Sequence, residues 1–306
     1  MNATFHGGLH RFAIFVFLWT ILLFVAGALV TSNDAALSVP DWPTSHGRLV
    51  PHLNQLQGGD RYEFSHRAAV AVLVFLLMTE TLWIWLKENR LWVRWLALAA
   101  VGGVVAQALL GWQVVSQLLH YWLPVLHACF AQVMFAAILG MAVFTSKWWI
   151  ESRAVLVDKG SPSIHFLAIA NAAITFLQVF LGAGFRHRDM PIWPHIAGSI
   201  VVLGVMIWTA AALRRRFDES RELSFGRILL HSMVGTQILL GGAAYWSRIV
   251  TQDAPQPMPV MVWLTVIHTV FGALVFGGSV LVVFLCYRLV SRRGAVAVAI
   301  GRPAAI

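Results

Sequence analysis

Four histidines occupy matching places in the long apolar runs of the sequence: His66, His127, His195 and His268. Two of them belong to a repeated window, W-L-P-V-L-H-A-C-F at 122–130 and W-L-T-V-I-H-T-V-F at 263–271. The other two each open an apolar run. Ionisable groups within such runs are rare and usually functional. Two facing histidines in a helical bundle are a common way to ligate haem iron, so we expect two such pairs.

Zinc ligation is a poorer explanation of the same pattern. The paired histidines are too far apart in sequence for a local zinc motif, and zinc would require further Cys or carboxylate ligands, which do not stand at matching places in the two halves. Hydrogen bonding between helices is the second alternative, and four equivalent positions count against it. The remaining eight histidines show no such pattern and receive no ligand role: His6, His10, His46, His52, His120, His165, His187 and His231.

The two halves of the pattern differ beside the first histidine. One half has E-F-S-H-R at 63–67, where the other has I-W-P-H-I at 192–196. If the helix begins early enough, Glu63 lies on the same face as His66. A carboxylate in one half alone predicts chemistry there and a resident cofactor in the other half. Alternatively, Glu63 only complements a helix N-terminus, and Arg67 pairs with Glu63, binds a haem propionate or extends to the interface.

The elements that position these residues are membrane-spanning helices. The chain has 306 residues, is 59% hydrophobic and 11% charged, and has a mean hydropathy of +0.74. These values are typical of a polytopic membrane protein. A span needs about 20 apolar residues, and the first run reads as a retained anchor rather than a signal peptide. Eight runs qualify: 12–31, 66–86, 92–115, 122–146, 164–184, 192–213, 225–247 and 260–288.

The distribution of Lys and Arg predicts the orientation. Sixteen of the 22 basic residues fall on the side that holds both termini. The positive-inside rule then places both termini in the cytoplasm and the four histidines near the outer face of the cell membrane. The basic residues lie between apolar runs, and no nucleic-acid motif is present, so the charge does not indicate a nucleic-acid partner.

A second repeat supports two equivalent halves. Q-A-L-L-G at 107–111 corresponds to Q-I-L-L-G at 237–241. We therefore predict an all-α membrane protein of two pseudo-twofold related four-helix bundles, because an even number of helices gives both halves one orientation. The predicted parts are an N-terminal bundle at 1–146 with a long outer loop at 33–62, a cytoplasmic linker at 147–163, a C-terminal bundle at 164–290 and a tail at 291–306.

The chain resembles the haem A synthase family over most of residues 12–290. The resemblance rests on residues whose order and spacing are specific together: A-L-S-V-P-D-W-P-T-S-H-G at 36–47, P-H-I-A-G at 194–198, and the motifs quoted above. It implies an oxidoreductase that converts a ring methyl of haem O to the formyl group of haem A, for use by terminal oxidases.

The resemblance also implies roles for the site residues. His195 and His268 would ligate a resident haem b, and His66 and His127 would flank the substrate haem. Glu63 would stabilise positive charge developing at the methyl carbon. Independently of the resemblance, the sequence offers Arg67 and Arg48 as candidate partners of haem propionates. They belong to the six arginines predicted on the outer side, Arg48, Arg61, Arg67, Arg186, Arg188 and Arg248. A haem O synthase and an electron-transfer protein are the expected partners, and a homo-oligomer is compatible with the sequence.

One departure from the family concerns the outer loop. Many bacterial members have two cysteines there, where this sequence has Val39 and Ser45. A thiol step in that loop is therefore not available to this chain. Two other functions use the same histidines: a di-haem b-type electron carrier, with two equivalent resident haems, and a haem carrier that leaves haem unaltered. Glu63 and the long loop favour the synthase over the electron carrier, because a carrier of electrons needs neither. The haem carrier is disfavoured because the sequence shows no pair of Gly/Pro-broken helices near the midplane.

Overall fold

The computed structural model describes residues 4–120, 122–152 and 156–291. It contains eight helices that are long and apolar enough to cross a membrane, which confirms all eight predicted spans. Most of them extend a few residues beyond the predicted bounds. They are α1 (Gly7–Ser32), α2 (Gly59–Lys87), α3 (Leu91–Ser116), α4 (Leu123–Phe144), α6 (Ile164–Arg186), α7 (Trp193–Phe217), α8 (Arg221–Val250) and α9 (Pro259–Leu289).

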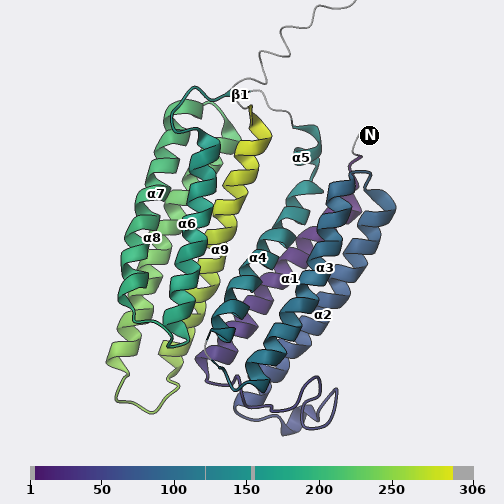
Figure 1. The fold of residues 1–306 in the computed structure, drawn as a ribbon, viewed down its shortest axis with the longest axis vertical. Helices are drawn as coiled ribbons and strands as arrows, with labels where there is room; N and C mark the ends of the chain where they lie inside the picture. Colours follow the sequence, from purple (N-terminus) through teal and green to yellow (C-terminus); the bar gives the residue numbers. More distant parts are fainter. Residues whose placement is uncertain (1–3, 121, 153–155, 292–306) are drawn as a thin grey trace, which may run out of the picture.

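The helices form two bundles of four (Figure 1). In the first, α1 contacts α2 and α4, and α3 contacts α2 and α4. In the second, α6 contacts α7 and α9, and α8 contacts the same two helices. The bundles meet where α1 and α4 pack against α9 and where α4 packs against α6. The prediction of an all-α membrane protein is therefore confirmed. Within each bundle the four helices contact one another in a closed ring, and fewer contacts join the two bundles.

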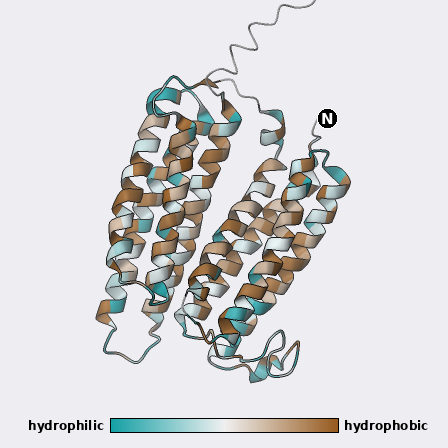
Figure 2. Cartoon of the chain, viewed as in Figure 1, coloured by the Kyte–Doolittle hydropathy of each residue, from teal (hydrophilic) through white to brown (hydrophobic). Residues whose placement is uncertain are grey.

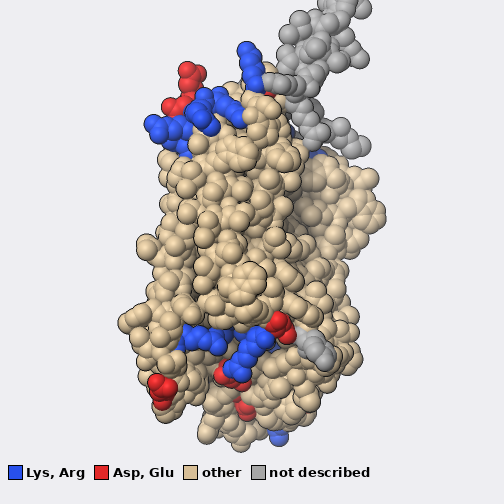
Figure 3. All heavy atoms as spheres, turned by 60° about the vertical axis from the view of Figure 1, so that its left-hand side comes forward, with Lys and Arg blue, Asp and Glu red and all other residues tan. Residues whose placement is uncertain are grey.

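Each bundle has an apolar core of its own. In the N-terminal bundle the core includes Val16, Leu77 and Ala97, and in the C-terminal bundle it includes Leu167 and Val282. Hydrophobic residues dominate the middle of the helices and hydrophilic residues their ends (Figure 2). On the face shown in Figure 3, charged side chains gather toward the two ends of the molecule, with an uncharged band between them. Such a band is what a bilayer about 30 Å thick requires.

The segment that joins the bundles has structure that the sequence did not predict. It contains the short helix α5 (Lys147–Glu151) and the strand β1 (Leu156–Val157), which pairs in parallel with β2 (Val290–Ser291). Asp158 then accepts hydrogen bonds from the backbone N–H groups of Gly160 at 2.9 Å and Ile164 at 2.5 Å. The predicted tail lies outside the described residues except for Ser291.

The long outer loop begins after α1 and includes the 3₁₀ turn η1 (Leu53–Gln55). Asp41 organises its first part by accepting hydrogen bonds from the Thr44 hydroxyl at 2.5 Å and from the backbone N–H groups of His46 and Gly47, both at 2.8 Å. These donors lower the pKa of the Asp41 carboxyl well below its usual range, and the Thr44 hydroxyl has the largest effect. Hydrogen bonds to Asp41 therefore fix the conformation of the first part of the loop.

Candidate functional site

The C-terminal pair of histidines has the geometry of a shared metal ligand set. His195 lies near the start of α7 and His268 lies in α9. Their ring centroids are 6.2 Å apart, and the ring planes are at 85°. A metal–imidazole bond is about 2.0–2.1 Å, and the ring centre lies roughly 1 Å beyond the nitrogen. Two such ligands on opposite sides of one ion place the ring centres roughly 6 Å apart. The two residues thus fit a single haem iron.

Each of the four histidine rings packs against a glycine of a neighbouring helix. A Cβ atom added to that glycine would lie closer to the ring Cε1 atom than ordinary van der Waals contact allows. The distance from the added Cβ to Cε1 would be 3.2 Å for Gly27 and His66, 3.1 Å for Gly111 and His127, 2.9 Å for Gly182 and His195, and 3.0 Å for Gly241 and His268. Only glycine allows so close an approach of ring and backbone. The sites in the two halves are therefore built alike.

Three glutamines, each one helical turn before one of these glycines, bind the histidine backbone. The side-chain Nε2 atoms of Gln107, Gln178 and Gln237 donate to the carbonyl oxygens of His127, His195 and His268, at 2.9, 2.8 and 3.2 Å. Gln178 also lies 3.0 Å from the Nδ1 atom of His195. The fourth equivalent position is Leu23. The Q-x-L-L-G pair marks two of these glutamines in the sequence. The third stands in Q-V-F-L-G at 178–182, which has the same spacing but a Phe in place of the first Leu and was not predicted.

The N-terminal pair consists of His66 in α2 and His127 in α4, which lie within electrostatic range of each other. Within the described residues, the Nδ1 atoms of His66, His127 and His268 are buried and have no hydrogen-bond partner. Buried polar atoms normally find partners. Three of the four rings thus lack the bonds that a purely structural interhelical role would require, and this counts against that alternative.

Glu63 lies on α2 one turn before His66, because the helix begins at Gly59. Its carboxylate is buried, with 4% of the residue exposed. One oxygen, Oε2, accepts from the backbone N–H of Val39 at 2.9 Å and from the Ser38 hydroxyl at 3.1 Å. The other, Oε1, lies 2.5 Å from Nη2 of Arg67. The acid beside the first histidine is therefore bound to the outer loop.

Arg67 completes this connection between helix and loop. Its guanidinium donates to the backbone carbonyls of Asp41 at 2.6 Å, Thr44 at 2.9 Å and Val39 at 3.0 Å. Of the roles considered for Arg67, the structure shows pairing with Glu63. Arg48, the other candidate propionate partner, lies in the exposed loop with Nη1 2.6 Å from Nε2 of His52. The structure does not bring Arg48 to the histidine pair through any described contact.

His187, for which the sequence predicted no ligand role, follows α6 and lies within electrostatic range of His127. Burial, followed by the charges of Arg186 and His127, lowers the pKa of His187 to about 4. Its imidazole is therefore neutral at physiological pH. No sequence motif marks this residue, because its position depends on the packing of α6 against α4.

These features define a class of protein, a multi-pass membrane protein of two four-helix bundles, each with paired histidines near the same end. The family model described as cytochrome oxidase assembly protein, COX15-CtaA, matches residues 10–192. That is more than half of the chain, and the chain belongs to this family.

Curated relatives extend the similarity over most of the chain. A protein named heme A synthase from Lysinibacillus sphaericus (strain C3-41) is 24% identical over 91% of this chain and 93% of its own length. Heme A synthases from Staphylococcus aureus (strain bovine RF122 / ET3-1) and Listeria welshimeri serovar 6b are each 23% identical. The alignments cover 87% and 77% of this chain and 91% and 87% of those relatives, respectively.

Proposed function

We propose that this chain is a haem A synthase, an oxidoreductase that converts a ring methyl of haem O to the formyl group of haem A. The observation that carries the proposal is a difference between the two histidine sites, which are otherwise alike. Both halves hold a pair of histidines against glycines, but only the first has a buried carboxylate, Glu63, one turn from its histidine. Membership of the cytochrome oxidase assembly family supports the same activity.

In this proposal the two histidine pairs have different tasks. His195 and His268 hold a resident haem b, which supplies a one-electron redox centre when bound. His66 and His127 flank the substrate haem O and set its position relative to Glu63. The ion pair with Arg67 holds the Glu63 carboxylate in place, with the outer loop fixed beside it. A preorganised negative charge there stabilises positive charge that develops at the methyl carbon.

The proposal implies partners and an orientation. Oxidation of a methyl group to a formyl group with oxygen from water releases electrons and protons, so an electron-accepting partner is required. A haem O synthase supplies the substrate. By the positive-inside rule both termini face the cytoplasm, and the sites lie near the outer face of the cell membrane.

A di-haem electron carrier is the second candidate, and one observation favours it. The space between each ring and its glycine is nearly the same in the two halves, because a Cβ added to the glycine would lie 2.9–3.2 Å from the ring Cε1 atom in all four cases, as expected for two equivalent resident haems. The buried Glu63 and its attachment to the loop favour the synthase instead, because a carrier needs neither.

Haem extraction from the purified chain, after co-expression with a haem O synthase, tests the proposal. We expect haem b together with haem O or haem A by mass, and a b-type reduced-minus-oxidised spectrum. His195→Ala and His268→Ala should lose the haem b, whereas His66→Ala and His127→Ala should keep it and lose haem A production. Two equivalents of haem b and no other haem would favour the electron carrier. A chain without haem would contradict both candidates.

A further inference from the structure

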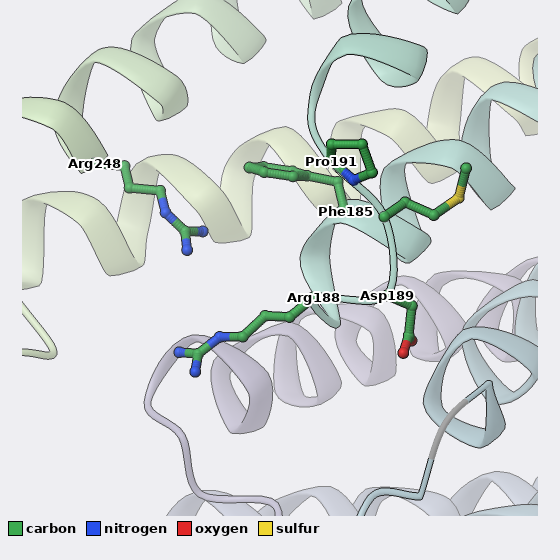
Figure 4. Close-up of a pocket in the computed structure, with 6 residues that line it drawn as sticks. Phe185, Arg188, Asp189, Pro191 and Arg248 are labelled. Atoms are coloured by element: carbon green, nitrogen blue, oxygen red, sulfur yellow. The ribbon is translucent and has the colours of Figure 1, made fainter.

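A cavity of about 370 Å³ opens at the ends of α6, α7 and α8, in the C-terminal half. It is lined by Phe185, Arg188, Asp189, Met190, Pro191 and Arg248 (Figure 4). Arg188 and Asp189 come from the connection between α6 and α7, whereas Arg248 lies in the last turn of α8. The cavity thus joins residues that are 60 positions apart in the sequence, numbers 188 and 248.

The cavity is strongly basic. The guanidinium groups of Arg188 and Arg248 extend toward the same open space, and the Asp189 carboxylate lies apart from them (Figure 4). Among the described residues, neither arginine forms an ion pair with a carboxylate. Arg248 instead lies over the Phe185 ring, 5.4 Å from its centroid. Arg186 lies within electrostatic range of both arginines and adds a third positive charge.

The cavity lies on the helices that hold the C-terminal histidines. Phe185 follows Gly182, which contacts the His195 ring, by three residues. Pro191 precedes His195 by four residues in sequence. Arg248 follows Gly241, which contacts the His268 ring, by seven residues, or about 10 Å along a helix at 1.5 Å per residue. The positive charges of Arg188 and Arg248 therefore lie on the side of the histidine pair that faces the nearby ends of these helices.

We propose that Arg188 and Arg248 bind the propionate carboxylates of the haem b that His195 and His268 hold. This inference rests on the proposed function, because it takes the resident haem b as given. A haem carries its two propionates on one edge, and a guanidinium binds a carboxylate through two parallel hydrogen bonds. Phe185 lies against the Arg248 guanidinium on one side, and both residues line the cavity.

Within the part of the N-terminal half that the structure describes, the equivalent positions carry no basic cluster. The repeat aligns Gly182 with Gly27 and Gly241 with Gly111, and the same offsets align the three arginines with Thr31, Asn33 and Leu118. Arg67, the arginine beside the first histidine pair, is already bound to Glu63 and to three carbonyls. Arginines that hold the propionates would slow the release of haem, so the cluster belongs in the half that retains its haem. The half that exchanges substrate for product lacks it.

Loss of haem b from the purified full-length chain to excess apomyoglobin tests the proposal. The variants are Arg188→Gln, Arg248→Gln and the double variant. Arg61→Gln is the matched control, because it removes one positive charge from an exposed position near the same end of the N-terminal half. We expect each cavity variant to lose haem b about tenfold faster, because a hydrogen bond to a charged group is lost. The double variant should be faster still, and Arg61→Gln should match the unaltered chain.

A second measurement separates propionate binding from a general disturbance of the fold. Removing a nearby positive charge disfavours reduction, so the haem b midpoint potential should fall in both cavity variants, while the low-spin bis-histidine spectrum stays the same. Arg248→Lys keeps the charge and should restore the potential more than the rate of haem loss. Unchanged loss and potential in the double variant would overturn the proposal. So would an effect seen only in vesicles containing anionic lipid, which would assign the cavity to a lipid headgroup.

The measurements of haem loss and midpoint potential do not require turnover of haem O. A chain that holds haem b but makes no haem A would contradict the proposed activity and leave the haem-loss comparison valid. A chain that binds no haem b would overturn both.

Discussion

Arg67 and Glu63, one turn apart on α2, form an ion pair with an Nη2–Oε1 distance of 2.5 Å. Both are also bound to the outer loop, Glu63 through the N–H of Val39 and Arg67 through three loop carbonyls. The acid beside His66 and the position of the loop are thereby coupled. A change in the loop would alter where the carboxylate lies, and the loss of the carboxylate would leave the partly buried Arg67 without its counter-charge.

Glu63→Ala should abolish haem A formation and leave haem b bound. Loss of a preorganised charge that acts on the transition state lowers turnover by about 10²-fold or more, whereas the haem b ligands lie in the other bundle. The measurement is the haem A yield per haem b in cells that make haem O. Asp60→Asn, in the first turn of the same helix, is the control and should keep the yield. Normal yield from Glu63→Ala would contradict the catalytic role.

Arg67→Lys should loosen the outer loop although it keeps the charge. A lysine ammonium cannot reproduce the planar fork that contacts Glu63 and three carbonyls together. Loss of two such bonds costs about 1–3 kcal/mol of local stability. Limited proteolysis of residues 38–47 should therefore be faster than in the unaltered chain. Arg61→Lys on the same helix is the control. Equal cleavage of Arg67→Lys and the unaltered chain would show that the carbonyl contacts do not hold the loop.

Asp41 gives the loop a defined response to pH. Its pKa in the folded chain lies well below the usual value of about 3.9. A carboxyl whose pKa is lowered by folding stabilises the fold above its unfolded pKa, and that contribution disappears as the pH falls toward the folded pKa. Amide exchange at His46 and Gly47, both of which donate to Asp41, should thus stay slow down to about pH 4 relative to its intrinsic rate. Asp41→Ala should exchange faster throughout. If the variant and the unaltered chain exchange alike, Asp41 does not organise the turn.

The helices and the histidines were predictable because their signals are local. Apolar runs of sufficient length fix the spans, and the repeated windows mark His127 and His268. The network of Glu63 with the loop was not predictable beyond its spacing from His66, because it depends on how the loop returns across α2. The same holds for His187 and for the pairing of β1 with β2. These contacts join segments that only the packed bundles bring together.

Gln178→Leu should weaken haem b binding. Leucine is chosen because it is the residue at the equivalent position of the first helix, Leu23. Gln178 binds both the carbonyl and the Nδ1 atom of His195, and loss of an outer-shell partner of a ligand typically costs 10–100-fold in metal affinity or activity, as a rough guide. Haem b content and the low-temperature EPR spectrum report the change. Gln117→Leu, at the C-cap of α3, is the control. An unaltered spectrum and haem content in Gln178→Leu would limit the glutamine to helix packing.

Two adjacent glycines of α8 offer a matched test of the ring–glycine contact. A Cβ at Gly241 would lie 3.0 Å from Cε1 of His268, whereas a Cβ at Gly242 meets no atom within 4 Å. Both changes to alanine gain roughly the same helix propensity, up to about 1 kcal/mol. Only Gly241→Ala displaces the His268 ring from its place opposite His195, so it should lose haem b or show an altered bis-histidine spectrum.

Gly242→Ala should bind haem b as the unaltered chain does and should be equally or more stable to heat. Haem b per chain and the reduced-minus-oxidised spectrum of the two variants, purified side by side, decide the matter. Equal haem content and identical spectra would mean that the His268 ring can shift without loss of the iron. The close approach would then be a packing feature and not a condition for the site.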